Sequence, residues 1–152
     1  MFVLRFDLRI PPFVETLTHG DQYREFLKMV DWADGKGFAA VVLSEHHGTE
    51  DGYMNSPLLL AGSVLGATDN LFCSVSALLL PLHDQLRIAE EIATIDLIAP
   101  GRFNVVIGVG YRESEFEMFA KNRKTRGRDT EEGIQTILTA LEGKPFEYKG
   151  RE

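Results

Sequence analysis

The sequence predicts an α/β fold built from parallel strand–helix units. Apolar runs of strand length alternate four times with helical patterns, and almost no residues remain between them for hairpin turns. This alternation is typical of parallel strands joined by right-handed crossovers. The strands are almost continuously apolar, which agrees with a parallel sheet because such sheets are covered on both faces. We therefore expect one domain over residues 1–152.

The expected elements follow from local periodicity and from end signals. The expected strands are 2–6, 38–43, 71–80 and 103–107, with 146–149 extended. The expected helices are 16–36, 56–66, 86–97, a short one near 115–119 and one around 129–142. Tyr23, Phe26, Leu27, Val30 and Ala33 form an apolar stripe along the first helix. Ser56 and Pro57 suit the N-cap and first position of the second helix.

The length of the chain limits how such a sheet can close. The 152 residues fit one domain, whereas a closed barrel of eight strand–helix units needs about 250 residues. The chain supplies four units, so it is either an open four-stranded domain or a barrel truncated after about four units. A half barrel has two unpaired strand edges, which predicts a homo-oligomer. Such an oligomer could be a dimer in which two copies pair edge to edge and close an eight-stranded barrel.

Composition excludes several classes of protein. Apolar residues make up 44% and charged residues 26%, as in ordinary globular proteins, and the net charge of −7 argues against nucleic acid. The basic segment 121–128 is flanked by acids, so it is a solvated loop or helix start, or a phosphate contact. Cys73 is the only cysteine and lies in an apolar strand, which predicts a packed thiol and a cytoplasmic protein. The charged N-terminus is not typical of a signal peptide, and no apolar run is long enough to span a membrane, so we expect no membrane partner.

Polar or glycine-rich segments follow three of the expected strands. They are Glu-His-His-Gly at 45–48, Pro-Leu-His-Asp at 81–84 and Gly-Val-Gly-Tyr-Arg at 108–112. The carboxyl ends of parallel strands meet on one face, which is where such folds place their chemistry. The sequence therefore predicts one composite pocket.

His46 and His47 are the candidate catalytic residues of this pocket. Neighbours at a strand end point to opposite sides, so the two are poor joint ligands for one metal ion, and we expect no metal site. An imidazole at a strand end is suited to donate or accept a proton. The alternative is one histidine hydrogen-bonded within the loop and one solvated.

Small residues in the third and fourth strands suggest a ligand that lies against the backbone. Gly108 and Gly110 would allow that approach, or they make a simple tight turn. The dinucleotide fingerprint fails because Glu113 occupies the position of its third glycine. Ser74 and Ser76 either relieve crowding against a helix or leave space for a planar ring.

Several motifs together resemble the luciferase-like monooxygenase family, over essentially the whole chain. They are Leu43-Ser-Glu-His-His47, Ser56-Pro-Leu58, Leu80-Pro81, Ala89-Glu-Glu91 with Asp96-Leu97, Gly101-Arg-Phe103, and Gly108-Val-Gly-Tyr111 with Glu115-Phe116. The resemblance implies a TIM (β/α)8 barrel that binds reduced FMN or the deazaflavin coenzyme F420. The chain resembles the N-terminal half of that barrel.

The resemblance also implies roles for individual residues. His46 matches the active-site histidine near the flavin ring, and His47 the neighbour used by deazaflavin members. Ser76 and Ala77 fall where the family has a non-proline cis peptide against the ring. The remaining implied cofactor contacts are Leu78 in the same strand and Gly108, Gly110 and Tyr111 in the loop after the fourth strand.

The chain departs from the family pattern at two places. Val109 stands where many members have an arginine that helps to hold the phosphate, and Phe119-Ala120 replaces the usual Phe-Gly pair. By resemblance the protein is a flavin-dependent oxidoreductase or monooxygenase that acts on a small organic substrate. The alternative is a truncated, inactive flavin-binding or structural half barrel that self-associates. A hydrolase or nucleotide binder is disfavoured, because the sequence has neither a Gly-x-Ser-x-Gly elbow nor a P-loop.

Overall fold

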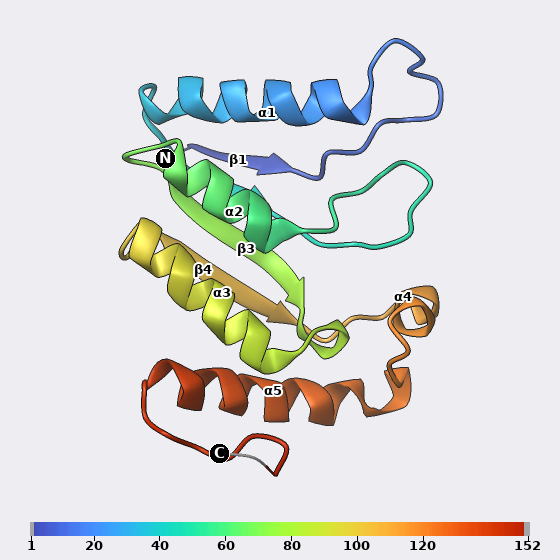
Figure 1. Cartoon of the computed structure of the whole chain (residues 1–152). Helices are drawn as coiled ribbons and strands as arrows, with labels where there is room; N and C mark the ends of the chain where they lie inside the picture. The colour runs from blue at the N-terminus through green and yellow to red at the C-terminus, as the bar shows by residue number, and fades with distance from the viewer. Residues whose placement is uncertain (1, 151–152) are drawn as a thin grey trace.

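Four parallel strands form one sheet in the order in which they occur along the chain (Figure 1). A computed structural model describes residues 2–150. The strands are β1 (Phe2–Phe6), β2 (Phe38–Leu43), β3 (Phe72–Leu79) and β4 (Phe103–Gly108). The helices are α1 (His19–Asp34), α2 (Pro57–Gly66), α3 (Gln85–Ile98), α4 (Glu113–Met118) and α5 (Arg126–Leu141), with 3-10 turns η1 (Leu80–Leu82) and η2 (Arg123–Thr125). The predicted α/β class and its parallel strand–helix units are confirmed.

Local interactions account for the places where element bounds differ from expectation. Helix α1 begins at His19 rather than at residue 16, because the Thr18 hydroxyl caps it by accepting a hydrogen bond from the Asp21 N–H at 3.1 Å. Helix α5 begins at Arg126 because it continues directly from η2. The segment 146–149 adds no strand to the sheet. Instead, the Tyr148 hydroxyl lies 3.1 Å from an Asp84 carboxylate oxygen at the start of α3.

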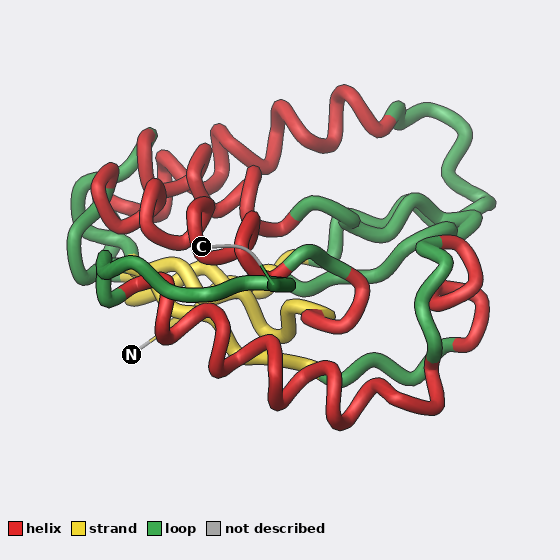
Figure 2. Tube along the Cα trace, turned by 60° about the horizontal axis from the view of Figure 1, so that its bottom comes forward, coloured by secondary structure: helices red, strands yellow, loops and turns green. Residues whose placement is uncertain are grey.

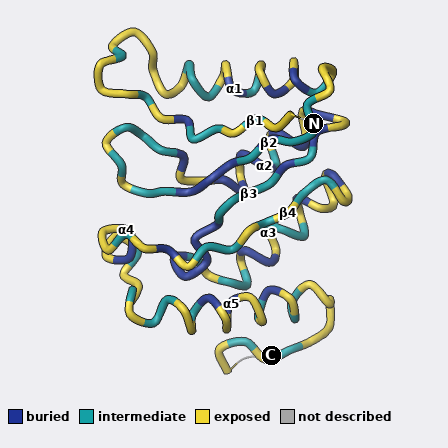
Figure 3. The backbone as a smooth tube through the Cα atoms, turned by 180° about the vertical axis from the view of Figure 1, so that it is seen from behind, coloured by how far each residue is buried: buried dark blue, intermediate teal, exposed yellow. Residues whose placement is uncertain are grey.

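The sheet is covered on one face only within residues 2–150, which corrects the expectation of two covered faces. Cys73 and Val75 are fully buried in the core, whereas Ser74 between them is only half-buried. In β4, Asn104 and Val106 are exposed. Alternate residues of a strand point to opposite faces, so one face packs against helices and the other is open (Figures 1 and 3). Four strand–helix units supply helices for the outer side of a curved sheet, and nothing in them covers its inner side.

The hydrophobic core lies between the sheet and the helices. Helix α2 is apolar around most of its circumference and packs against both β3 and α3. Its core residues are Leu58, Leu60, Ala61, Val64 and Leu65. Pro57 opens this helix as expected, although the Ser56 hydroxyl donates to the Asn55 side chain and accepts no hydrogen bond from an N–H of the helix. No helix within residues 2–150 combines the length and apolarity needed to cross a bilayer.

Burial of Cys73 predicts an unreactive thiol. Removal from water disfavours the thiolate and raises the pKa of Cys73 to about 12. Because the thiolate is the nucleophile, we expect native Cys73 to react with a thiol reagent at pH 8 at least ~1000-fold more slowly than in guanidinium chloride. Leu97→Cys is the matched control, because Leu97 is 83% exposed on α3. Equal rates for the two thiols in the native protein would show that Cys73 is accessible.

Candidate functional site

The chemistry-bearing segments collect at the carboxyl ends of the strands. The long connections that follow β1, β2 and β4 extend to the same side of the sheet, where α4 also lies (Figures 1 and 2). This placement follows from the parallel arrangement, since every strand finishes at the same edge. The prediction that three separate segments approach one another is confirmed by the contacts between them.

His46 is held by a buried carboxylate from α4. Its Nδ1 lies 2.8 Å from Oε1 of Glu115, a side chain that is 1% exposed. The same oxygen accepts the backbone N–H of His47 at 3.1 Å. The His46 N–H donates to the Met54 carbonyl at 3.0 Å, so the loop around it is fixed as well. A carboxylate acceptor at Nδ1 favours the tautomer with the proton on Nδ1, which makes Nε2 a proton acceptor.

Two tyrosines and one unused oxygen complete the surroundings of His46. The ring of Tyr53 lies edge-on at 4.8 Å between centroids, and that of Tyr111 at 5.8 Å. Oε2 of Glu115 is buried without a hydrogen-bond partner among the described residues. The structure therefore brings Tyr111 close to His46 and adds Glu115, which the sequence indicated only as part of a motif.

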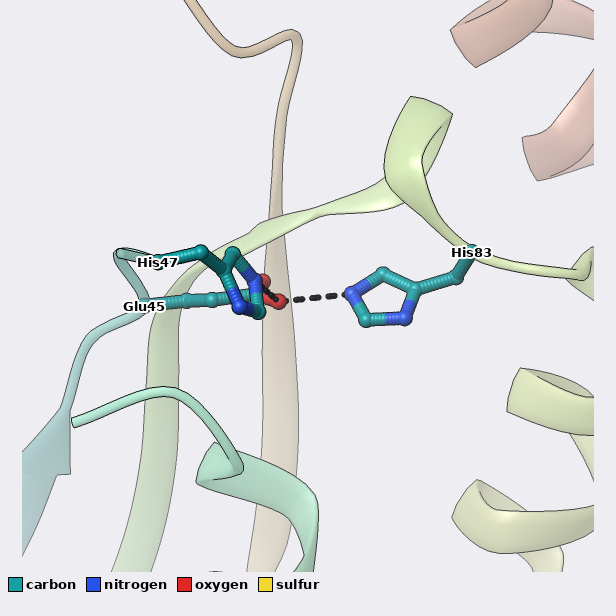
Figure 4. Close-up of side chains that lie close together, drawn as sticks. All are labelled: Glu45, His47 and His83. Atoms are coloured by element: carbon teal, nitrogen blue, oxygen red, sulfur yellow. Dashed lines mark hydrogen bonds and ion pairs between the residues drawn. The ribbon is translucent and has the colours of Figure 1, made fainter. Parts of the chain in front are cut away.

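His47 contacts a second buried carboxylate, Glu45 (Figure 4). Its Nε2 lies 2.7 Å from Oε1 of Glu45, and the Nε2 of His83 lies 2.6 Å from the same oxygen. The other oxygen, Oε2, accepts the Leu79 N–H at 2.5 Å. The expectation that the two adjacent histidines face different partners is confirmed.

The pKa of Glu45 reflects two opposing effects. Burial disfavours the carboxylate, but hydrogen bonds from His47 and His83, attraction to His83 and the Leu79 N–H outweigh it and lower the pKa to about 2. Glu45 is 2% exposed. The carboxylate is therefore ionised at neutral pH and links the end of β2 to the end of β3. Sequence reasoning placed Glu45 and His83 at strand ends but did not pair them.

The third strand has the unusual backbone that the resemblance implied. The Ser76–Ala77 peptide bond is cis, and the pairing of β3 with β4 shifts register between Ser76 and Leu78. A Cβ at Gly108 would lie 2.9 Å from the Cβ of Ala77, so β4 passes this segment at very close range. Ser76 alternates with residues of the covered face, so relief of crowding against a helix does not explain it. The side chain of Leu78 is buried in the core, which leaves its backbone for any ligand contact.

The loop after β4 needs glycine for structural reasons as well. Gly110 has φ of +69°, and a Cβ there would lie 2.9 Å from the ring of Phe116. Val109 and Tyr111 on either side are exposed, at 48% and 63%. The guanidinium of Arg112 lies 5.8 Å from the centre of the Tyr111 ring. The tight-turn explanation thus accounts for Gly110, and contact of this loop with a cofactor stays a prediction.

Comparison with known proteins places the chain in a family. The model of the family described as luciferase-like monooxygenase matches residues 4–152. The chain belongs to this family. It is 31% identical over 106 residues to the beta chain of the alkanal monooxygenase of Aliivibrio fischeri, an alignment that covers 68% of this chain and 32% of that protein.

Solved structures agree with the fold. The oxygenating constituent of 3,6-diketocamphane monooxygenase from Pseudomonas putida, a type II Baeyer–Villiger monooxygenase in complex with FMN, superposes with a TM-score of 0.85 at 22% identity. It is matched over 99% of this chain and 42% of its own. An F420-dependent secondary alcohol dehydrogenase in complex with an F420–acetone adduct superposes with a TM-score of 0.76 at 20% identity. The match covers 98% of this chain and 44% of the dehydrogenase. The chain thus has the fold of part of a luciferase-like TIM barrel and spans less than half the length of these relatives.

The close passage of β4 over β3 predicts a steric effect at Gly108. Gly108→Ala would place a methyl group 2.9 Å from the Cβ of Ala77 and 3.3 Å from Leu79. Because the Ala77 Cβ is attached directly to the backbone and cannot rotate away, we expect a loss of about 1–3 kcal/mol in the free energy of unfolding by urea. Gly62→Ala in α2 is the control. Its nearest neighbour would be Ile95 at 4.0 Å, so a gain of about 0.5–1 kcal/mol is expected there. Equal effects of the two changes would contradict the steric explanation.

The lowered pKa of Glu45 predicts a contribution to acid sensitivity. A carboxyl whose pKa falls on folding stabilises the native state above its unfolded pKa, and that stability is lost as pH falls through the folded value. For Glu45 the window runs from 4.5 down to about 2. As the pH is lowered through this window, the urea concentration at the unfolding midpoint should decrease more steeply for the wild type than for Glu45→Gln. Parallel curves would show that Glu45 titrates alike in the folded and unfolded states.

Proposed function

We propose that this chain provides the proton-transfer and ring-contacting half of a flavin-dependent oxidoreductase, a monooxygenase acting on a small organic substrate with reduced FMN or F420. The observation that supports this most directly is the His46–Glu115 pair at the strand ends. Family membership supports the reaction class. The relatives in the comparison include one structure with FMN and one with an F420 adduct.

The proposed role of His46 follows from its two ring nitrogens. Glu115 accepts from Nδ1, and no described residue hydrogen-bonds Nε2. The imidazole can therefore accept a proton at Nε2, and the buried carboxylate stabilises the resulting imidazolium. Glu115 acts through His46, so it is a positioning residue. Its 1% exposure keeps water from competing for the hydrogen bond.

The residues of β3 and β4 suit a flat ring system. The cis Ser76–Ala77 segment and Gly108 bring two strands together with little side-chain volume, and the exposed Tyr111 lies beyond them. Arg112 is the cation that this loop offers to a phosphate, since Val109 occupies the position where many family members have arginine. When bound, the cofactor supplies the electrons or hydride for the reaction. Backbone groups of Ala77 and Gly108 would orient its ring, and the Tyr111 ring would cover one side.

A second candidate function is supported by the open face of the sheet. Val3 of β1 and Val106 of β4 are each 46% exposed, and both strands are sheet edges within the described residues. Unpaired edges and uncovered apolar residues favour self-association. The second candidate is therefore an inactive half barrel that self-associates and binds flavin without turnover. Light scattering during gel filtration, together with a turnover assay, separates the two candidates.

The enzymatic proposal predicts that His46 matters for turnover more than for cofactor binding. The protein would be titrated with FMN and with F420, and then supplied with the reduced cofactor, O2 and an alkanal, the class named for the Aliivibrio fischeri relative. We expect His46→Asn to lower kcat/KM by about 10²–10⁴-fold, with the cofactor Kd changed much less.

Glu115→Gln tests the positioning role. It should lower kcat with little change in KM, because the imidazolium formed during proton transfer loses its counter-charge. His19→Asn is the matched control, since His19 lies at the exposed start of α1. Cofactor binding by the wild type with no turnover would favour the inactive half barrel. Absence of binding to both cofactors would contradict the enzymatic proposal and any flavin-binding role, and would favour a purely structural half barrel.

A further inference from the structure

Three side chains from two separate loops converge on one point beside the proposed active site (Figure 4). Glu45 and His47 follow β2, and His83 follows η1 after β3. The Nε2 atoms of both histidines lie within 2.7 Å of Oε1 of Glu45, and the three candidate ligand atoms all lie within 4.8 Å of one another. His46 and His47 contact different carboxylates, which agrees with the expectation that they are poor joint ligands for one metal ion. His47, however, has a different histidine partner that sequence spacing did not reveal.

The cluster holds a buried negative charge without a permanent positive partner. The side chain of Glu45 is fully buried, and its only ion pairs among the described residues are with His47 and His83. Neither imidazole carries a permanent charge. Lys121 reaches toward this region, but its Nζ contacts the His83 carbonyl at 3.5 Å. Buried charges in proteins are generally paired with an opposite charge or coordinate a metal ion.

We propose that Glu45, His47 and His83 form a binding site for a divalent transition-metal ion of the Zn²⁺ type. One carboxylate oxygen and two imidazole nitrogens are a donor set that suits zinc, and three protein ligands leave a fourth position open. Coordination through Nε2 requires the ring proton of each histidine to reside on Nδ1. The bound ion then replaces the two hydrogen bonds to Glu45 and supplies the missing positive charge.

The geometry permits this exchange with small movements. Ligand distances of about 2.0–2.2 Å place neighbouring ligand atoms roughly 3–3.5 Å apart, so the two separations of 2.6–2.7 Å between Glu45 and the histidines must widen by less than about 1 Å. The two histidine nitrogens lie within 4.8 Å of each other and must reach a similar separation. The ring of His83 can move, because its side chain is 23% exposed and it follows a short 3-10 turn. It also lines a hollow of about 300 Å³ with Leu78 and Asn55.

The proposed ion would have a structural effect on the neighbouring site. Oε2 of Glu45 accepts a hydrogen bond from the Leu79 N–H, and the backbone N–H of His47 itself donates to Oε1 of Glu115. An ion at this point therefore ties the ends of β2 and β3 together next to the Ser76–Ala77 segment. The ring of Phe119, 4.6 Å from that of His47, covers one side of the cluster. The proposed role of His46 does not depend on this ion, and metal binding can be measured without any flavin.

The first experiment measures binding on tag-free protein treated with EDTA and then dialysed. Calorimetry with Zn²⁺ should give one site per chain, and Co²⁺ should acquire visible ligand-field absorption. We expect Glu45→Gln and His83→Asn each to weaken Zn²⁺ binding by at least about 10–100-fold. His19→Asn, which changes a histidine outside the cluster, should leave binding unchanged. Retention of Zn²⁺ binding by both cluster variants would overturn the proposal.

A second measurement uses the wild type alone, so that misfolding of a variant cannot decide the result. Heteronuclear NMR of the histidine ring nitrogens should show Zn²⁺ perturbing the Nε2 atoms of His47 and His83 and leaving His19 unaffected. Thermal unfolding should shift upward with Zn²⁺ concentration. Lack of binding, or perturbation of His19 instead, would refute the site. Flavin titration of the zinc-free protein tests the proposed function independently, so the two can fail separately.

Discussion

The parallel pairing of four consecutive strands is the constraint on which the rest of the molecule depends. It brings the residues after β2, β3 and β4 to one edge, although they are far apart along the chain. Antiparallel pairing would have placed the segment after β3 at the opposite edge from those after β2 and β4. The contacts of His46 with Glu115 and of Glu45 with His83, which span 69 and 38 residues, both require this arrangement.

Two buried carboxylates have different roles at this edge of the sheet. Glu115 comes from the first turn of α4 and fixes the orientation of a single imidazole. Glu45 comes from the end of β2 and gathers two imidazoles and the backbone N–H of Leu79. Adjacent histidines thus enter two separate environments, because successive side chains leave the backbone in opposite directions. One environment suits proton transfer, and the other suits retention of a cation.

The open face of the sheet sets the limit of what this part of the barrel can do. Residues such as Ser74, Asn104 and Val106 line a surface that a closed barrel would bury. Exclusion of water from the reacting centre would prevent side reactions in the flavin chemistry that we propose. Within residues 2–150, the strand ends, the histidines and the close passage of β3 and β4 are already in place without that cover. The site is therefore organised by the outer core, between the sheet and its helices.

Much of the architecture could be predicted from local sequence. Alternating apolar runs specified the strands, the stripe around Phe26 and Val30 specified α1, and Ser56-Pro57 specified the start of α2. The segments after the strands led to the expectation that residues 45–48 and 108–112 lie at one site, and the family resemblance led to the cis bond at Ser76–Ala77. Periodicity succeeds there because burial on one face of an element is recorded in the spacing of its residues. The expectation of a covered second face failed because an apolar strand has the same appearance whether its partner is present or not.

The sequence by itself determined the order and type of the elements and the edge at which the polar groups lie. Only the tertiary structure decided which groups meet: Glu115 with His46, and His83 with Glu45 and His47. Such contacts depend on strand register, loop path and side-chain direction. None of these leaves a periodic signal in the neighbouring residues, so a histidine at position 83 has the same sequence appearance whether it faces solvent or a buried carboxylate.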